Sequence, residues 1–120
     1  MIYNTLGHSQ LQISALSFGC MSLQNDQTQN THILHHAIAL GINFFDTADL
    51  YNKGMNEISV GKALKEKRHQ IILATKVGNQ WRADGSGWDW NPRKEYILQQ
   101  IDGSLQRLQT DYIDLYQLHG

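Results

Sequence analysis

Short apolar segments alternate with longer segments of helical periodicity along most of this sequence, and this order limits the possible folds more than any other feature. Four apolar runs have the composition of strands: 16–20 (LSFGC), 42–47 (INFFDT), 70–78 (QIILATKVG) and 111–120 (DYIDLYQLHG). Three segments with apolar residues on one helical face lie between them: about 26–40, 56–65 and 92–108. Strands that alternate with helices form right-handed βαβ units, so the sequence predicts an α/β fold with a parallel sheet.

Two further segments stand outside this alternation. Residues 1–16 (MIYNTLGHSQLQISAL) contain two short strand-like runs around a turn at Gly7 to Ser9, which predicts an N-terminal hairpin. Residues 78–90 (GNQWRADGSGWDW) have the composition of a loop, and we expect them to be irregular. Asn91 then provides an N-cap, and Pro92 is expected to be the first residue of the third helix.

Composition excludes several classes of protein. Hydrophobic residues make up 41% and charged residues 18% of the 120 residues, as in one ordinary globular domain. The formal net charge is −1, which gives no indication of a nucleic acid partner. No apolar run approaches the ~18 residues of a membrane span, so we expect no membrane partner.

Two features bear on the cellular compartment. The single cysteine, Cys20, has no partner for an internal disulfide, which favours a reducing compartment. All ten Lys and Arg residues lie at or after Lys53, so the N-terminus resembles neither a secretory signal nor a mitochondrial transit peptide. We therefore predict a cytoplasmic location.

An open doubly wound sheet and part of a (β/α)8 barrel both agree with the alternation. A doubly wound sheet often has a G-x-G-x-x-G turn after its first strand, and FGCMSLQ contains none. Polar residues favour the barrel, because Asp46, Lys76 and His119 each end a successive strand and Tyr51 lies just after the second. In a parallel barrel these strand ends meet at one face, where the active site is built.

These four residue types have a specific chemistry in common. A phenol is a poor proton donor at neutral pH unless a nearby cation stabilises its phenolate. The sequence predicts that Lys76 provides this cation for Tyr51 and that Asp46 keeps the ammonium charged and oriented. His119 is expected to hydrogen-bond a substrate oxygen. Such a set can protonate a carbonyl oxygen as hydride reaches its carbon.

The sequence resembles the aldo-keto reductase family in three motifs: GINFFDTADLYNKGMNEISVGKAL (41–64), IILATKVG (71–78) and SLQRLQTDYIDLYQLH (104–119). The resemblance implies that Asp46, Tyr51, Lys76 and His119 are the catalytic tetrad, with Tyr51 as general acid. It also implies that the N-terminal hairpin closes the bottom of a barrel. The implied activity is NADPH-dependent reduction of aldehydes and ketones to alcohols.

The same resemblance predicts the cofactor site. FGCMS matches the first βα loop of the family, so Gly19, Cys20 and Met21, together with Asp46, are expected beside the nicotinamide of NADPH (NADP+). No metal is expected. The partner implied is a small carbonyl substrate.

The length of the chain limits this prediction, because an intact barrel needs eight strand–helix units and roughly 250 residues. We therefore predict the N-terminal hairpin plus the first four strands and three helices of a TIM barrel. Residues 1–120 would be the N-terminal part of a single NADP-dependent oxidoreductase domain, with the C-terminal half absent. Alone, the chain is expected to be inactive and to self-associate through exposed barrel edges.

Other readings remain open. The whole protein could be an NADPH-binding sensor or regulatory subunit of the same superfamily, or another TIM-barrel enzyme in which the tetrad is coincidental. His32 and His36 are one helical turn apart, but we expect solvent-facing histidines rather than a metal site. Cys20 is expected to be a packing residue. The tryptophans of residues 78–90 either form an apolar substrate wall or pack within their own loop.

Overall fold

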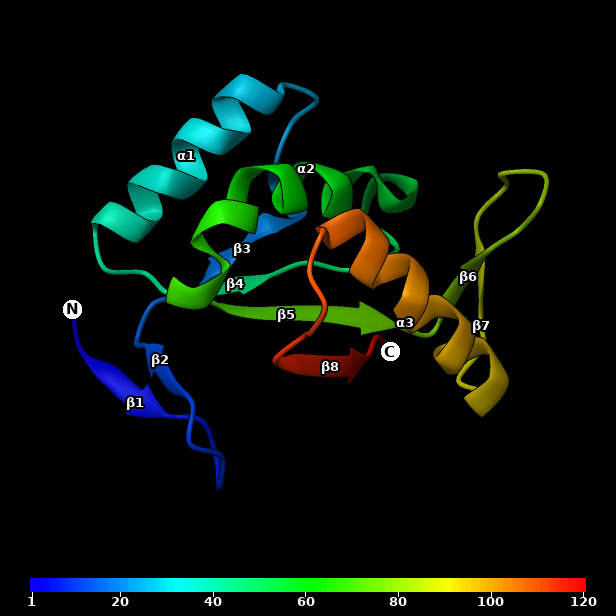
Figure 1. Cartoon of the computed structure of the whole chain (residues 1–120). Coiled ribbons are helices and arrows are strands. Elements are labelled where there is room, and N and C mark those ends of the chain that lie inside the picture. Colours follow the sequence, from blue (N-terminus) through cyan, green and yellow to red (C-terminus); the bar gives the residue numbers. More distant parts are fainter.

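The computed structural model describes residues 1–120, and its centre is a four-stranded parallel sheet in the order β3-β4-β5-β8 (Figure 1). The strands of this sheet are β3 (Phe18–Gly19), β4 (Phe44–Asp46), β5 (Ile72–Val77) and β8 (Leu115–Leu118). The helices are α1 (Gln27–Ala39), α2 (Met55–Leu64) and α3 (Lys94–Leu108), with short 3-10 helices η1 (Cys20–Ser22), η2 (Tyr51–Gly54) and η3 (Lys65–Gln70). The predicted strand–helix alternation and the half-barrel are confirmed.

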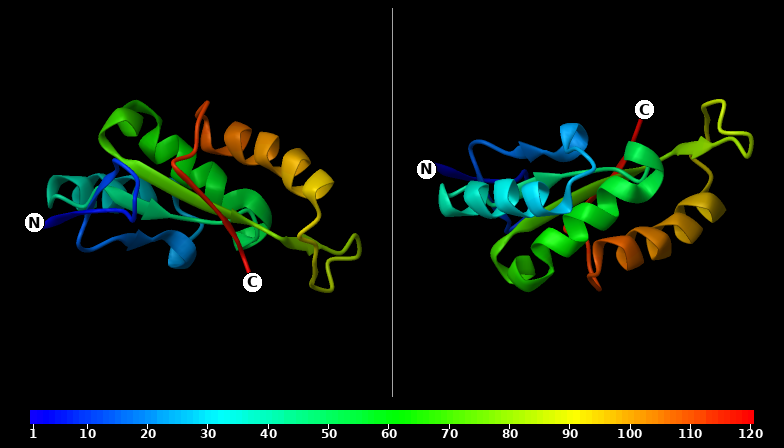
Figure 2. Two further views of the ribbon diagram at one scale, coloured as in Figure 1. Left: turned by 90° about the horizontal axis from the view of Figure 1, so that it is seen from below. Right: turned by 90° about the horizontal axis from the view of Figure 1, so that it is seen from above.

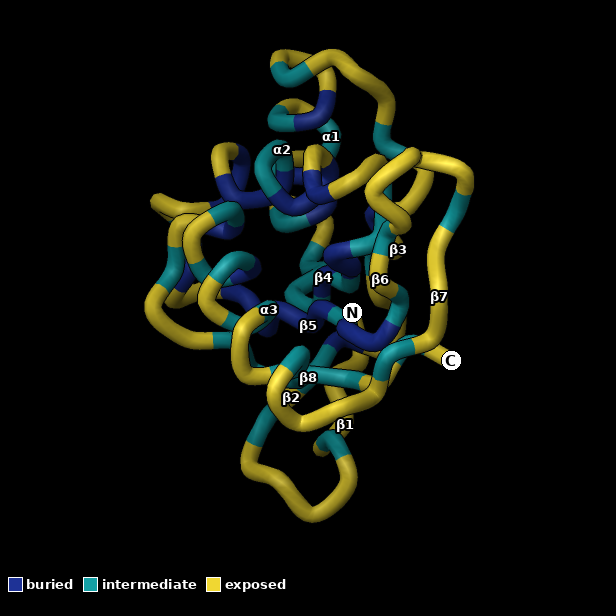
Figure 3. The backbone as a smooth tube through the Cα atoms, turned by 90° about the vertical axis from the view of Figure 1, so that its right-hand side faces the viewer, coloured by how far each residue is buried: buried dark blue, intermediate teal, exposed yellow.

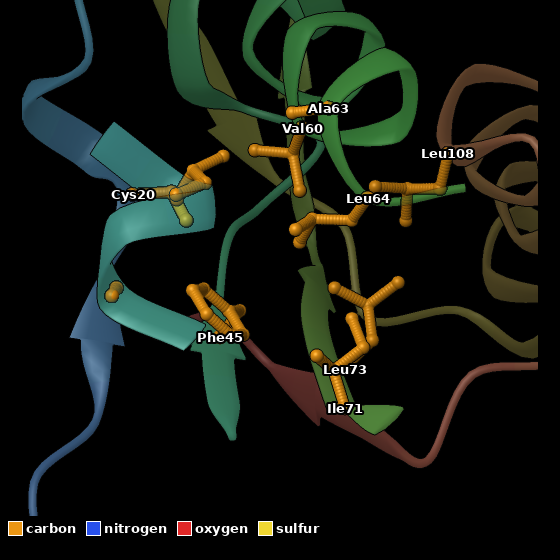
Figure 4. Packing of buried hydrophobic residues seen from close by; sticks show 10 residues of the cluster. Cys20, Phe45, Val60, Ala63, Leu64, Ile71, Leu73 and Leu108 are labelled. Carbon is orange, nitrogen blue, oxygen red and sulfur yellow. The ribbon is translucent and has the colours of Figure 1, made fainter. Parts of the chain in front are cut away.

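The three helices lie side by side along one face of the sheet, with α2 between α1 and α3 (Figure 2). Their buried side chains and those of the sheet form one core (Figure 4), made up of Cys20, Leu34, Ala37, Phe45, Val60, Ala63, Leu64, Ile71, Leu73 and Leu108. On the opposite face Phe44, Leu115 and Gln117 remain partly exposed. None of the helices combines the length and the apolar character of a membrane span.

Local sequence explains where α1 begins and ends. The Asp26 side chain caps the helix by accepting a 3.0 Å hydrogen bond from the Gln29 amide. Leu34 and Ala37 then fall on the buried face, three residues apart. The chain leaves the helix through Gly41, whose φ of 98° is a left-handed conformation that favours glycine.

The packing of α2 against α3 depends on one glycine. A Cβ at Gly61 would lie 2.5 Å from the carbonyl oxygen of Arg107, which belongs to the backbone of α3. Only glycine therefore allows the two helices to approach this closely. Fully buried Val60 and Leu108 fill the space on either side.

The N-terminal hairpin is formed by β1 (Tyr3–Thr5) and β2 (Gln12–Ser14), paired antiparallel as predicted. Asn43, just before β4, holds it in place: its Oδ1 accepts from the Ser14 amide at 2.7 Å and its Nδ2 donates to the Gln12 carbonyl at 2.8 Å. The hairpin therefore lies at the N-terminal ends of the sheet strands, opposite the ends that carry Asp46 and Lys76.

Two expectations for residues 78–94 were wrong. Instead of an irregular loop, residues 79–90 form an antiparallel hairpin of β6 (Asn79–Trp81) and β7 (Trp88–Trp90), largely exposed in Figure 3. Glycines at positive φ, Gly85 and Gly87, allow its turn. The third helix begins at Lys94 rather than Pro92, because Asn91 Oδ1 accepts from the Arg93 amide in a turn before the helix.

Candidate active site

The C-terminal ends of three neighbouring strands bring Asp46, Lys76 and His119 to one edge of the sheet. Asp46 pairs in register with Ala74, and Lys76 lies two residues further along β5 on the same face. His119 directly follows β8, and its amide donates to the Val77 carbonyl at 2.8 Å. The parallel register alone therefore places these side chains together.

Lys76 is the centre of the contacts in this cluster. Its Nζ lies 2.9 and 2.8 Å from the two carboxylate oxygens of Asp46, 3.0 Å from the Thr47 carbonyl and 3.3 Å from the Tyr51 hydroxyl. The Lys76 side chain is 14% exposed and that of Asp46 is 33% exposed. A partly desolvated ammonium thus joins a carboxylate to a phenol.

Tyr51 is carried on η2, which follows β4 after a short loop. Its ring is perpendicular to that of His119, with ring centroids 5.6 Å apart. Asn79 Nδ2 donates to the His119 carbonyl at 2.8 Å and thereby ties the end of β8 to the start of β6. The structure therefore brings all four predicted tetrad residues into one cluster.

The environment of His119 favours a neutral imidazole. Burial lowers the pKa of His119, and the positive charge of Lys76 lowers it further, against a smaller opposite effect of Asp46. The buried ring atom Nδ1 has no hydrogen-bond partner. A neutral imidazole has one N–H, so this side chain can act as a hydrogen-bond donor without adding a second cation beside Lys76.

Residues of the expected cofactor site occupy different environments. Gly19 ends β3 as the register partner of Asp46, and Met21 is 65% exposed. The Cys20 side chain instead lies in the core (Figure 4), with no exposed surface. Burial, with a smaller contribution from the charge of Asp46, raises the pKa of the Cys20 thiol to about 12. Cys20 is therefore a protonated packing residue, and only its backbone can face a ligand.

One residue of this cluster was not singled out in the sequence. Gln117 lies on β8 as the register partner of Lys76, and its Nε2 donates to Asp46 Oδ1 at 3.3 Å. Alternation along a strand is the signal that would have found it, because Gln117 lies two residues before His119.

The β6–β7 hairpin packs beside the cluster. Trp81 Nε1 donates to the Leu50 carbonyl at 3.3 Å, next to Tyr51. A Cβ at Gly78 would lie 2.6 Å from the ring of Trp90, and one at Gly120 would lie 3.1 Å from the same ring. Trp90 thus packs over the backbone that directly follows β5 and over the last residue after β8.

Two other features lie away from the cluster. The rings of His32 and His36 are stacked on α1 with centroids 6.5 Å apart, and no group of three or more His, Cys, Asp or Glu side chains is placed to hold a metal ion. A cavity of about 380 Å³ lies between the start of α1 and α2, and half of its lining residues carry side-chain amides, among them Asn25, Asn52 and Asn56.

Comparisons with known proteins agree on one family. A sequence model described as the aldo/keto reductase family matches residues 15–120. An uncharacterized oxidoreductase, YqkF of Bacillus subtilis (strain 168), is 56% identical over 115 residues. Aldo-keto reductase yakc [NADP(+)] of Schizosaccharomyces pombe is 37% identical over 114 residues. The holo form of aldo-keto reductase AKR11C1 from Bacillus halodurans superposes with a TM-score of 0.96 at 57% identity.

The matched proteins are longer than this chain. YqkF matches 96% of the chain but only 38% of its own length, and yakc matches 89% of the chain and 34% of its own length. The Bacillus halodurans structure covers 100% of the chain, which corresponds to 40% of that protein. The chain therefore spans about two fifths or less of the length of these relatives.

Proposed function

This chain belongs to the aldo/keto reductase family, and we propose that it supplies the proton-transfer groups of an enzyme that reduces aldehydes and ketones to alcohols with NADPH. The observation that supports the proposal most directly is the position of Lys76 Nζ, in contact with both Asp46 and the Tyr51 hydroxyl. A structural ion pair would need no phenol at this position. A phenol in contact with an ammonium is instead suited to donate a proton to a carbonyl oxygen.

The residues fit a flat ring placed against the end of β3. Apart from Gly19 itself and its two chain neighbours, no residue has an atom within 4 Å of the position that a Cβ would take on Gly19, so the backbone there is open to close approach. Met21 is exposed beside it, and Asp46 lies opposite in register. We propose that Gly19, Met21, the Cys20 backbone and Asp46 contact the nicotinamide of NADPH, which supplies the hydride when bound.

Each tetrad residue has a separate role in the proposed reaction. Tyr51 donates its phenolic proton to the carbonyl oxygen while a C–H bond forms at the carbonyl carbon. Lys76 stabilises the resulting phenolate, which then regains a proton from solvent, and Asp46 holds Lys76 in place. Neutral His119 donates a hydrogen bond to the same carbonyl oxygen and orients it.

The location and partners follow from the same proposal. Free, buried Cys20 fits a reducing compartment, and we propose the cytoplasm. The proposed partner is a small carbonyl compound, with neither nucleic acid nor membrane involved. Strands β3 and β8 have unpaired edges and are the proposed surfaces for self-association when residues 1–120 are present alone.

A chimeric reductase tests the proposed reaction. In it, residues 1–120 replace the matching part of the Bacillus halodurans protein, which retains its own remaining residues. NADPH oxidation with an aromatic aldehyde is followed at 340 nm. Many turnovers per protein molecule are expected. Oxidation that stops at one equivalent would favour a sensor or regulatory subunit, and absence of nicotinamide binding would contradict both functions.

A further inference from the structure

We propose that Gln117 is a positioning residue for the reduction: its side-chain amide holds the Asp46 carboxylate in the orientation that keeps Lys76 against Tyr51. The inference rests on the function proposed above and adds a residue to the machinery that carries it. It starts from one contact, the 3.3 Å hydrogen bond from Gln117 Nε2 to Asp46 Oδ1.

The position of Gln117 follows from the sheet register. Gln117 is paired with Lys76 across β5 and β8, while Asp46 on β4 lies on the other side of β5. All three side chains point to the same face of the sheet, because residues in register on parallel strands share a face. The amide therefore reaches Asp46 across the central strand, past Lys76.

The hydrogen bonds of Asp46 show why this contact matters. Its carboxylate oxygens have only two side-chain donors, Lys76 at 2.8–2.9 Å and Gln117. Lys76 has three hydrogens and divides them among Asp46, the Thr47 carbonyl and the Tyr51 hydroxyl. A third of the Asp46 side chain is exposed, so without a second donor the carboxylate is free to turn toward solvent and draw Lys76 away from Tyr51.

A neutral amide suits this role better than a charged group. A carboxylate at position 117 would repel Asp46 and compete with it for Lys76. A guanidinium or ammonium would compete with Lys76 for Asp46. The glutamine amide fixes the carboxylate while leaving the charge of the Asp46–Lys76 pair unchanged.

The test uses two substitutions in the chimeric reductase, with a matched control. Gln117→Leu removes the donor at similar size, and kcat is expected to fall about 10- to 150-fold, the effect of one hydrogen bond to a charged group. The affinity for NADPH should change less than twofold. Gln106→Leu removes an exposed glutamine of α3 whose side chain makes no hydrogen bond, and it should leave kcat unchanged.

Gln117→Glu provides a readout that a purely structural role would not move. A protonated glutamate can still donate to Asp46, whereas an ionised one repels it. The activity of Gln117→Glu relative to the parent should therefore be highest at low pH and should fall as pH rises. The relative activity of Gln117→Leu should not change with pH in this way. If both position-117 variants match the Gln106→Leu control in kcat and in pH profile, the proposal is overturned.

A measurement without turnover separates this inference from the proposed function. The side-chain amide signal of Gln117 in a 15N–1H spectrum is assigned by its loss in Gln117→Leu. Asp46→Ala should shift it, while Asp102→Ala, at an exposed position on α3, should not. If Asp46→Ala leaves the chemical shift of the Gln117 amide unchanged, the proposed contact is overturned, whatever the carbonyl reductase activity of the protein. A responsive signal in a protein that reduces no carbonyl supports the contact and contradicts only the proposed function.

Discussion

At the scale of single residues, two buried carboxylates, Glu57 and Asp49, differ in their partners, because the Arg107 cation pairs with Glu57 alone. Glu57 is fully buried and accepts hydrogen bonds from Thr75 Oγ1 at 2.7 Å and Arg107 Nε at 2.8 Å. Asp49, in the loop that leads to Tyr51, is 8% exposed, and neither of its carboxylate oxygens has a hydrogen-bond partner. Burial, and then the charge of Glu57, raises the pKa of Asp49 to about 7.

The raised pKa of Asp49 predicts how stability depends on pH. Between its ordinary value of 3.8 and about 7, the folded chain binds more protons at Asp49 than the unfolded chain, so this residue makes stability fall as pH rises through that window. Asp49→Asn removes the effect and should stabilise the chimeric reductase by about 1–3 kcal/mol at pH 8, with little gain at pH 4. Urea unfolding at pH 8 and pH 4 measures this change in the free energy of unfolding. An equal stabilisation at both pH values would contradict the raised pKa of Asp49.

Tyr51 is the residue on which the proposed reaction depends most. Tyr51→Phe keeps the ring beside His119 but removes the transferable proton, so kcat should fall by a factor on the order of 10²–10⁴. NADPH affinity, measured by fluorescence titration, should change little. Tyr112→Phe, at an exposed position 45% accessible to solvent, serves as the control and should retain full activity. Near-normal turnover of Tyr51→Phe would remove Tyr51 from the mechanism.

Lys76 should act through its charge. Lys76→Met removes the cation that contacts Tyr51 and should slow reduction at neutral pH and move the pH–rate profile to higher pH. Stability should fall by about 1 kcal/mol, since Asp46 is left without its cation but remains partly hydrated. Lys62→Met, on the exposed side of α2, is the control. A pH–rate profile identical to that of the parent would show that Lys76 does not act on Tyr51.

At the scale of secondary-structure elements, the close approach of α2 and α3 is the most sensitive contact. Gly61→Ala would place a Cβ 2.5 Å from the backbone of α3 and should destabilise the fold by about 2–3 kcal/mol. Gly103→Ala is the matched comparison within α3, because its Cβ would meet only the movable end of Arg107 at 3.0 Å. That substitution should be neutral or stabilise by up to about 1 kcal/mol. Similar midpoints for both variants in thermal unfolding would contradict the packing described.

At the scale of the whole molecule, the sheet is open at both edges. Strands β3 and β8 each have only one neighbour, and the face that carries Lys76 has no helix covering it. Residues 1–120 expressed alone should therefore self-associate and should reduce no aldehyde, because an uncovered sheet is a template for pairing. Light scattering measures the self-association, near-UV circular dichroism reports on tertiary packing, and an NADPH oxidation assay measures aldehyde reduction. A monomer with sharp near-UV signals and measurable turnover would contradict the prediction.

Much of the fold and of the candidate site follows from the sequence because both depend on local patterns. The continuous apolar run of β5 predicts an inner strand of a parallel sheet, and β5 lies between β4 and β8 with five of its six residues buried. Three of the four predicted tetrad residues follow from strand ends: parallel strands have their C-terminal ends at one edge, so Asp46, Lys76 and His119 lie there together, while Tyr51 is carried on η2.

Tertiary structure alone decided which of these groups touch and which are buried. Gln117 and Asp46 are 71 residues apart, and only the register across β5 brings them within hydrogen-bond distance. In the hairpin of residues 79–90, Trp90 packs over Gly78 and Gly120, and the local composition of these residues does not predict that contact. The periodicity of apolar residues indicates which side of a helix or strand is buried, but it does not indicate the distance between two elements. Hydrogen bonds and desolvation depend on that distance.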